Sequence, residues 1–168
     1  MKIGLLSDTH GWIHPRIFDF FENCDEIWHA GDIGNIETAN ILNSFRPLRA
    51  VYGNCDDTKV RQAYRKNLRF TVEEVDVFIT HIGGAHGRYE QEVAKELSKN
   101  PPALFICGHS HIALVEYDDK YKFLHINPGA AGYMGFHKMM TAIRFSIEGK
   151  NITDLELIEL GERGKVVI

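Results

Sequence analysis

The sequence predicts a mixed α/β (α+β) fold, in which two β-sheets pack face to face and helices cover their outer sides. Two observations predict it. Short apolar runs alternate with helical patterns up to residue 107, and alternating apolar and polar residues follow Gly108. The short runs are typical of buried strands, whereas the alternation is typical of strands with one exposed face. Packing two sheets against each other buries both kinds of strand.

The first part of the chain is predicted to follow a β-α-β-α-β order. The apolar runs that we interpret as strands are residues 3–6, 26–30, 48–52, 75–80 and 103–107, with a helix as the competing interpretation for any one run. Apolar side chains recur three or four residues apart in residues 13–23, 36–45 and 89–97, which predicts helices. A shorter helix is predicted over 57–66, with Asp56 or Asp57 as its N-cap.

The second part of the chain is predicted to be mostly β. Residues 112–117, 121–127, 139–147 and 152–160 alternate apolar with polar side chains and are separated by turn residues. This pattern predicts an antiparallel meander. Because no repeat or flexible linker divides the sequence, residues 1–168 are expected to form a single domain.

Composition limits the classes of function. The net charge of -4 argues against an extensive nucleic-acid surface or a membrane-binding face. Three cysteines, Cys24, Cys55 and Cys107, fit reduced thiols better than a disulfide framework. The apolar run at the N-terminus is too short for a signal peptide, and no later run approaches a membrane span. We therefore expect a cytoplasmic protein without a membrane partner.

Five segments carry metal-ligand side chains at points where an apolar run gives way to a loop. They are Asp8-Thr9-His10, Gly31-Asp32, Gly53-Asn54-Cys55-Asp56, Thr80-His81 and Gly108-His109-Ser110-His111. Ligands bind at the carboxyl ends of strands in α/β sheets, so these side chains can converge. Residues i and i+2 of an extended chain face the same side, which makes Asp8 with His10, and His109 with His111, chelating pairs. The preceding glycines permit the tight turns that a crowded site needs.

The types of donor narrow the choice of metal. The candidate ligands are imidazoles, carboxylates and one amide, without a thiolate: Asp8, His10, Asp32, Asn54, His81, His109 and His111. Such donors suit Mn²⁺, Fe or Zn²⁺ better than Ca²⁺ or an iron–sulfur cluster. Their number exceeds what one tetrahedral zinc ion needs, and two metals that share a carboxylate account for it.

In this order the motifs resemble those of the calcineurin-like binuclear metallophosphoesterases, and most closely the small, capless bacterial and archaeal phosphodiesterases. With the later Asn127-Pro128-Gly129 turn, the resemblance spans about two-thirds of the chain. It implies a four-layer αββα sandwich of two mixed β-sheets. It also implies two divalent metal ions, with Mn²⁺ favoured over Fe, Zn²⁺ or Ni²⁺. By the resemblance, Asp8, His10, Asp32 and His111 bind one metal, and Asp32, Asn54, His81 and His109 bind the other.

The resemblance further implies hydrolysis of a small phosphorylated substrate, a phosphodiester or alternatively a phosphomonoester. Two dications, the carboxylates of Asp8 and Asp32 and a bridging hydroxide leave a charge of about +1, which can hold the phosphate while the hydroxide attacks phosphorus. Small relatives form dimers or higher assemblies, so a homodimer or higher homo-oligomer is also implied. The alternative is a non-catalytic interaction scaffold, as in the phosphoesterase-like subunit of retromer. A scaffold has no reason to keep every ligand, and the full set favours an enzyme.

The candidate catalytic residues Asn54, Cys55 and Asp56 include a departure from the family pattern, because the family usually has His where Cys55 stands. That His is credited with protonating the leaving group or holding phosphate, and a thiol with a reference pKa of about 8.5 is a weak acid for this role. A small buried hydrophobe is the competing interpretation of Cys55. Asp56 is expected to cap a helix, to support a ligand, or both.

Histidines outside the motifs are expected to be structural or surface residues. His86 competes with His81 as a ligand, and His81 is preferred because it ends a predicted strand. The others lack a partner at ligand spacing, and they are His14, His29, His125 and His137.

Overall fold

The computed structural model describes residues 1–164, which form two five-stranded mixed sheets and a short hairpin. The first sheet contains, in spatial order, β12 (Asn151–Glu162), β11 (Met139–Glu148), β1 (Lys2–Leu6), β2 (Glu26–His29) and β3 (Leu48–Ala50). The second contains β4 (Asn67–Val72), β5 (Val75–Thr80), β8 (Leu104–Ile106), β10 (Phe123–Pro128) and β9 (Ala113–Asp118). The hairpin pairs β6 (Gly84–Ala85) with β7 (Arg88–Tyr89).

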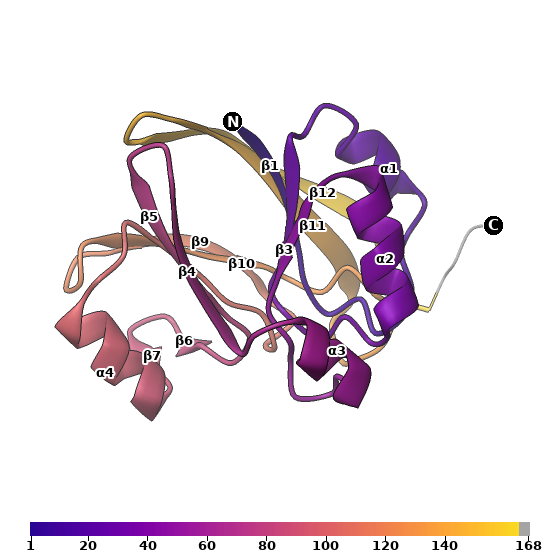
Figure 1. Ribbon diagram of the computed structural model, residues 1–168, viewed down its shortest axis with the longest axis horizontal. Coiled ribbons are helices and arrows are strands. Elements are labelled where there is room, and N and C mark those ends of the chain that lie inside the picture. The colour runs from indigo at the N-terminus through magenta and orange to yellow at the C-terminus, as the bar shows by residue number, and fades with distance from the viewer. Residues whose placement is uncertain (165–168) are drawn as a thin grey trace.

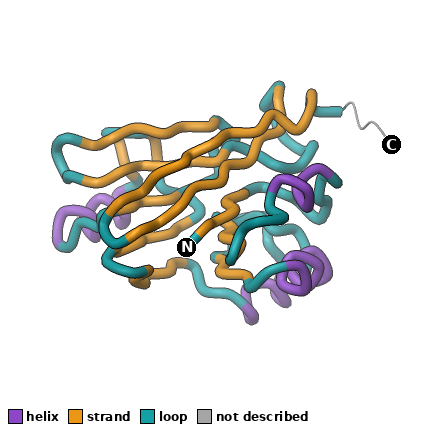
Figure 2. The backbone as a smooth tube through the Cα atoms, turned by 90° about the horizontal axis from the view of Figure 1, so that it is seen from above, coloured by secondary structure: helices purple, strands orange, loops and turns teal. Residues whose placement is uncertain are grey.

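Helices cover the outer side of each sheet. On the side of the first sheet lie α1 (Arg16–Phe20), α2 (Ile36–Phe45) and α3 (Thr58–Ala63), and α4 (Gln91–Lys99) lies on the side of the second (Figure 1). Seen from above, the strands occupy the middle of the molecule and the helices its two sides (Figure 2). The predicted four-layer αββα sandwich is therefore confirmed.

The core explains the layers. Ile3 and Leu5 of β1 are fully buried between the sheets, where they join a cluster with Val77 and Ile79 of β5. The opposite face of β1 packs against α1, and a Cβ at position 4 would lie 2.6 Å from the ring of Phe21, so only glycine fits there. A strand that is buried on both faces reads as a continuous apolar run, as the sequence does at this point.

The predicted meander is wrong. β9 pairs with β10 in the second sheet, whereas β11 pairs with β12 in the first, so residues 129–138 cross from one sheet to the other. Alternation specifies a hairpin but does not specify which sheet the hairpin joins. The strand β4 was not predicted, although it forms an edge of the second sheet.

The boundaries of α1, α3 and α4 also differ from the predicted 13–23, 57–66 and 89–97. α1 is shorter than the expected 13–23 and follows Pro15, which precedes its first turn. Asp57 is the N-cap of α3, because its carboxylate accepts a hydrogen bond of 3.0 Å from the Val60 N–H. Asp56 therefore does not cap this helix.

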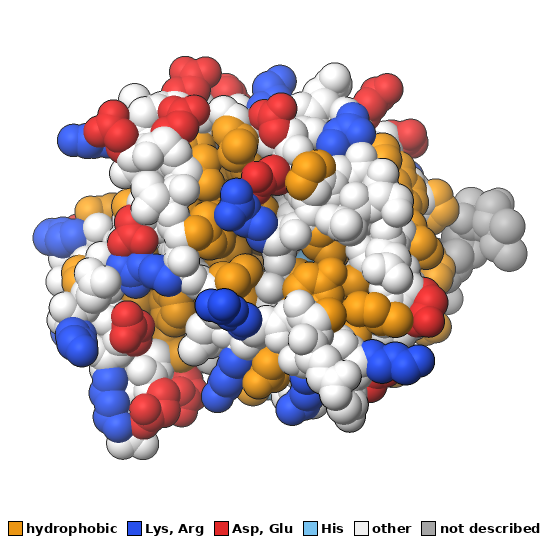
Figure 3. Space-filling view, viewed as in Figure 1, with side chains coloured by type: hydrophobic (Ala, Val, Ile, Leu, Met, Phe, Trp, Pro, Cys, Tyr) orange, Lys and Arg blue, Asp and Glu red, His pale blue; other side chains and the backbone are white. Residues whose placement is uncertain are grey.

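The surface carries no large field of one charge on the face shown in Figure 3, where Lys and Arg are interspersed with Asp and Glu. Within residues 1–164, no helix has the length and apolar character that crossing a membrane requires.

Candidate metal centre

The candidate ligands follow the carboxyl ends of parallel strands from both sheets. Asp8 and His10 follow β1, Asp32 follows β2 and Asn54 follows β3, while His81 comes directly after β5. His109 and His111 follow β8. Because β1, β2 and β3 are parallel to one another, as are β5 and β8, each sheet delivers its ligands at one edge.

Backbone hydrogen bonds join these strand-end loops to one another. The Asp8 N–H donates to the Gly31 carbonyl at 3.0 Å, and the His10 N–H donates to the Asp32 carbonyl at 3.0 Å. Between loops of the second sheet, the Gly108 N–H donates to the His81 carbonyl at 3.0 Å. The loops therefore hold the ligand side chains in one fixed arrangement.

Five of the candidate ligands have left-handed backbone. Their φ angles lie between 48° and 66°, and they are Asp8, His10, Asp32, His109 and His111. Residues with a side chain rarely adopt this region, at a cost of about 1–3 kcal/mol each. Such strain collects at functional sites, and here it falls on the predicted ligands.

The glycines before the ligands serve two purposes. Gly31 has a φ of +97°, as the prediction of a tight turn requires, and a Cβ there would also lie 2.6 Å from Nδ1 of His81. Gly53 does not have a left-handed φ, but a Cβ at this position would overlap the carboxylate of Asp32. Its role is therefore to let the Asn54 turn approach Asp32 closely.

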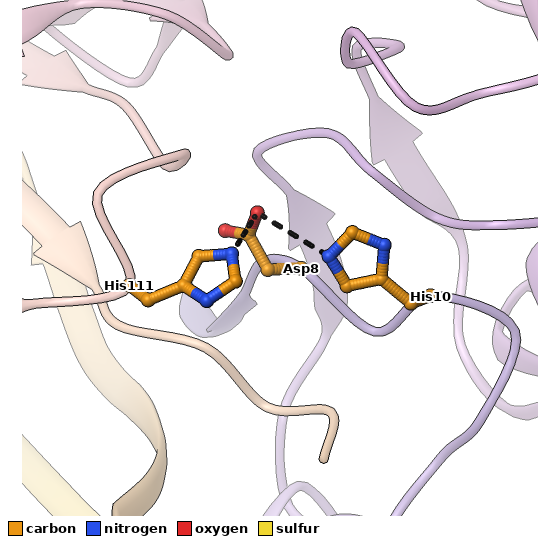
Figure 4. Close-up of side chains that lie close together, drawn as sticks. All are labelled: Asp8, His10 and His111. Carbon is orange, nitrogen blue, oxygen red and sulfur yellow. Dashed lines mark ion pairs between the residues drawn. The ribbon is translucent and has the colours of Figure 1, made fainter. Parts of the chain in front are cut away.

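Asp8 is buried, and only one of its two carboxylate oxygens accepts hydrogen bonds. Its Oδ2 accepts hydrogen bonds from the Ser7 hydroxyl at 2.6 Å and from the His109 N–H at 3.2 Å. Its Oδ1 makes no hydrogen bond within the part of the chain that the structure describes. The Nε2 atoms of three histidines face this oxygen without forming one. His111 lies at 3.1 Å and His10 at 4.0 Å (Figure 4), and His81 lies at 3.9 Å.

The charge of Asp8 persists despite its burial. Burial alone would raise the pKa of this carboxyl, but His111, His81 and the Ser7 hydroxyl together hold the pKa below its ordinary value. Asp8 is thus an ionised carboxylate with a free oxygen aimed at imidazole nitrogens, which is the environment a cation would satisfy.

Asp32 lies between two groups of imidazoles. Its Oδ1 accepts a hydrogen bond of 2.8 Å from the Cys55 N–H, and its Oδ2 lies 3.2 Å from Nε2 of His81 and 3.9 Å from Nε2 of His10. Burial raises the pKa of Asp32, but the hydrogen bond with His81 and its charge outweigh this effect and hold the pKa well below the usual range. One carboxylate thus reaches both halves of the site.

The ring of His81 is fixed in one orientation. Its Nδ1–H donates to the Ala30 carbonyl at 2.7 Å, so the lone pair of the neutral ring is on Nε2. This atom faces the Asn54 Oδ1 at 3.1 Å as well as Asp32. Burial lowers the pKa of His81, but Asp32 and Asp8 outweigh it, so the pKa is raised overall. Lone pairs converging in this way need a cation, either a proton or a metal ion, between them.

The ligand atoms fall into groups suited to cations. Asp8, His10 and His111 offer donor atoms within 4.8 Å of one another, and so do Asp32, His81 and His109. These two groups match the halves that the resemblance implies, apart from Asn54 and the sharing of Asp32. A third group joins Cys55 to His10 and Asp32, which the sequence did not indicate. The residues present therefore fit two divalent cations in their donor chemistry.

The three candidate catalytic residues lie in the turn after β3 but face different surroundings. Cys55 is exposed, and its Sγ accepts a hydrogen bond of 3.3 Å from the Asn54 Nδ2. Partial burial and the negative charge of Asp32 raise the pKa of its thiol. Asp56 is buried, and its two oxygens accept hydrogen bonds of 2.7 Å from the N–H groups of Gly34 and Gly53. Asp56 thus holds the turn in place.

One residue that the sequence missed contacts a candidate ligand. The His137 Nε2–H donates to the Gly132 carbonyl at 2.9 Å, so its Nδ1 accepts a hydrogen bond of 3.1 Å from the Nδ1–H of His111. This contact leaves the lone pair of His111 on the Nε2 that faces Asp8. Burial lowers the pKa of His137 and keeps the ring neutral. Nothing at ligand spacing marks His137, because it lies 26 residues beyond His111.

His29 joins the loops after β1 and β2 through hydrogen bonds. Its Nδ1 accepts a hydrogen bond of 3.1 Å from the Gly31 N–H, and its Nε2–H donates to the Thr9 hydroxyl at 2.9 Å. That hydroxyl donates in turn to the Ile33 carbonyl at 2.9 Å. Complete burial lowers the pKa of His29 to about 3, so the ring is neutral. His29 is therefore structural, as expected.

The competing ligand His86 lies elsewhere. Its Nδ1 is 3.1 Å from Nδ1 of His125, on which its ring is stacked. His125 is buried, with its Nε2 3.2 Å from Sγ of Cys107, and its pKa is lowered to about 4 by burial. His14 accepts a hydrogen bond from the Arg16 N–H in the turn before α1. Among the groups of possible metal donors in residues 1–164, none contains these three histidines.

Comparison with known proteins identifies the family of this chain. A probable metallophosphoesterase from Methanothermobacter thermautotrophicus is 30% identical over 137 residues, which is 77% of each chain. The structure of an archaeal phosphodiesterase matches with a TM-score of 0.73 at 23% identity, over 95% of this chain and 99% of that one. Vps29 from Entamoeba histolytica, in complex with Zn²⁺, matches with a TM-score of 0.71 at 16% identity, over 96% of this chain and all of that one. These two structural likenesses show a shared fold.

The family model agrees with the site geometry. The model of the calcineurin-like phosphoesterase superfamily domain matches residues 1–150, which include every candidate ligand and His137. The family implies divalent metal ions, and the carboxylates and imidazoles described above fit them. The chain therefore belongs to the calcineurin-like phosphoesterase superfamily and is a metallophosphoesterase by family.

Proposed function

We propose that this chain is a phosphodiesterase that hydrolyses a small phosphorylated substrate with the help of two divalent metal ions. The observation that carries the proposal is the buried, ionised Asp8, whose free oxygen faces three imidazole nitrogens. A buried carboxylate oxygen without a hydrogen bond is costly, and a cation held by the same atoms removes that cost. Membership of the family supports a metal-dependent hydrolase.

Seven side chains would hold the two ions. In this proposal Asp8, His10, Asp32 and His111 bind one ion, and Asp32, Asn54, His81 and His109 bind the other. When bound, the ions would supply positive charge toward the phosphoryl oxygens and lower the pKa of water into the neutral range. The donor types favour Mn²⁺, with Fe, Zn²⁺ or Ni²⁺ as alternatives.

Other residues of the chain would position these ligands. Asp56 fixes the turn that carries Asn54, and His137 sets the tautomer of His111. Cys55 lies beside the centre with a thiol whose pKa is raised, so it would donate a proton poorly. The reaction should therefore favour esters with good leaving groups.

A diester fits the charge of the site better than a monoester. The cleft over the centre is lined by residues that include neither Lys nor Arg, within the part of the chain that the structure describes. No side-chain cation is thus available there for the second negative charge of a monoester. A phosphodiester carries one negative charge, which the metal ions alone would neutralise.

The competing function is a non-catalytic interaction scaffold, because the likeness to Vps29 extends over the whole fold. That Vps29 structure also holds Zn²⁺, so metal binding alone does not separate the two functions. The left-handed backbone at five candidate ligands favours an enzyme, since strain of this kind collects at reactive sites.

Hydrolysis measured with added metal tests the proposal. With Mn²⁺, the protein should hydrolyse bis(p-nitrophenyl) phosphate faster than p-nitrophenyl phosphate. Asp32→Asn and His81→Ala should each lower kcat/KM by about 1,000-fold. Matched controls are Asp119→Asn, in an exposed turn, and His86→Ala, which should both retain activity. Equal activity in the first two variants would refute the site, and no turnover with Mn²⁺, Fe²⁺, Zn²⁺ or Ni²⁺ would favour the scaffold.

A further inference from the structure

An apolar wall borders the cleft above the candidate metal centre. The cleft has a volume of about 750 Å³, which suits a small molecule. Five candidate ligands of the centre line it, and so do Ile112, Met134 and Phe136, which we call the wall. Ile112 is 68% exposed, Met134 is 49% exposed and Phe136 is fully exposed. Exposed loops normally carry small or polar residues, so three large apolar side chains around one cleft require an explanation.

The wall is attached directly to the metal centre. Met134 and Phe136 lie on the segment 129–138 between β10 and β11, and the Gly132 N–H donates to the Asp8 carbonyl at 3.1 Å. In the same segment, His137 is hydrogen-bonded to His111. A Cβ at Gly135 would overlap the ring of His111, so the backbone between Met134 and Phe136 packs on that ligand. The wall therefore has a fixed position relative to the reacting centre.

The lining of the cleft is uncharged apart from the candidate metal ligands. It includes no Lys or Arg within the described residues, and its polar groups besides the candidate ligands are the neutral side chains of Cys55, Ser110 and His137. An anionic substituent beside the wall would lose its water without gaining a partner. An apolar substituent would instead bury its own surface and that of the wall.

A second cleft, of about 880 Å³, also touches Asn54 but has a different character. Its lining contains charged side chains of both signs, which are Arg61, Arg65, Lys66, Arg69, Glu90, Glu92 and Glu96. Two of its cations are already engaged, because Arg61 donates to the carbonyls of Asp56 and Asn54 and Arg69 pairs with Asp76. An apolar substituent is therefore better accommodated in the first cleft.

We propose that Phe136, Met134 and Ile112 bind a planar aromatic ester group of the substrate, such as an aryl ring or a nucleobase, and so select aromatic phosphodiesters. Aromatic rings stack on Phe, and the thioether of Met makes favourable contacts with ring edges. This inference rests on the proposed phosphodiesterase function, because it assigns the substrate class of the same site.

Binding of two monoanions that differ only in their ester groups tests the wall. Calorimetric titration of the full-length, Mn²⁺-loaded protein with diphenyl phosphate and with dimethyl phosphate gives two values of Kd. We expect the phenyl diester to bind about tenfold more tightly, and Phe136→Ala or Met134→Ala to reduce that ratio to about twofold. Phe136→Trp should keep the ratio, because it retains a flat ring. The matched control is Tyr117→Ala, which removes an aromatic side chain that is 54% exposed on β9 outside the cleft, and it should also keep the ratio.

The outcomes separate this inference from the proposed function. Equal Kd values for the two diesters in the wild type, or an unchanged ratio in Phe136→Ala, would refute the proposed binding of an aromatic group by the wall, even if hydrolysis is observed. The proposal is also refuted if Phe136→Ala changes the oligomeric state in size-exclusion chromatography but keeps the ratio of Kd values. Phe136 would then contact a second copy of the chain. Absence of hydrolysis in the wild type would refute the function, while the ratio of Kd values still tests the wall.

Discussion

The floor and the wall of the cleft are built in opposite ways. The floor consists of the seven candidate ligands, five of which have left-handed backbone, and the buried residues Asp8, Asp32 and His81 are each held by hydrogen bonds to neighbouring loops. The wall consists of exposed apolar side chains on two loops, and its contacts with the floor are made by backbone and by His137.

This difference separates two properties of the site. A floor with strained backbone and fixed polar atoms gives up conformational stability for preorganisation, which lowers the barrier of the reaction. A wall without hydrogen-bonding side chains does not change the barrier of the reaction, but it changes which substrate binds. We therefore expect changes in the floor to lower kcat and metal affinity, and changes in the wall to act on KM and on the Kd of the substrate.

The largest effect after removal of a ligand is expected at a residue without a functional group. Gly53→Ala places a Cβ against the carboxylate of Asp32 and should push that carboxylate aside. A displacement of about 1 Å in such a site lowers activity by about 100-fold. Activity and bound Mn²⁺ measured on the folded variant check this expectation. Wild-type activity in the variant would show that Asp32 does not need its observed position.

A smaller effect is expected at the contact between floor and wall. His137→Ala frees the ring of His111 to change tautomer and should weaken metal binding by about tenfold, because groups that orient a metal ligand contribute about this much. The matched control is His14→Ala, which removes a buried ring that contacts Trp12 and the Arg16 N–H, and this variant should bind metal normally. Calorimetric titration with Mn²⁺ compares the two variants. Equal Mn²⁺ affinities in the two variants would show that His137 does not position a metal ligand.

The smallest effect is expected at His29, and it concerns how the stability of the fold depends on pH. Burial keeps His29 neutral with a pKa of about 3, whereas the unfolded chain takes up a proton at this residue below the ordinary pKa of about 6.5. The unfolded state therefore binds more protons between these values, and stability falls as the pH falls through this window. The slope for one proton is about 1.4 kcal/mol per pH unit.

His29→Gln should make this slope shallower by about one proton between pH 6.5 and pH 5. Denaturant unfolding of the metal-free protein at several pH values measures the slope in the wild type and in the variant. An unchanged slope would mean that His29 takes up its proton in the folded state as well.

The floor could be predicted from the sequence, and the wall could not. Each of these ligands lies within a few residues of the end of an apolar strand, so the order Asp8, Asp32, Asn54, His81, His109 is visible along the chain. The αββα layers follow from the same strands and from the helices between them. Local pattern thus determines this part of the molecule.

The remaining features depend on the path of residues 129–138 in space. The sequence patterns specify the β9–β10 and β11–β12 hairpins but not that they join different sheets, so the crossing segment was not predicted. His137 and Phe136 lie on that segment, and neither has a partner at a spacing that the sequence reveals. The exposed apolar side chains of the wall also resemble ordinary core residues until their exposure is known.

Activity of the metal-stripped protein, titrated with Mn²⁺ at a protein concentration well above the Kd, tests the central claim most directly. The account predicts that hydrolysis of bis(p-nitrophenyl) phosphate rises with added Mn²⁺ and reaches a plateau at about two equivalents per chain. A plateau at one equivalent would contradict the two-ion site. No hydrolysis at any ratio of Mn²⁺, Fe²⁺, Zn²⁺ or Ni²⁺ to protein would contradict the proposed enzyme itself.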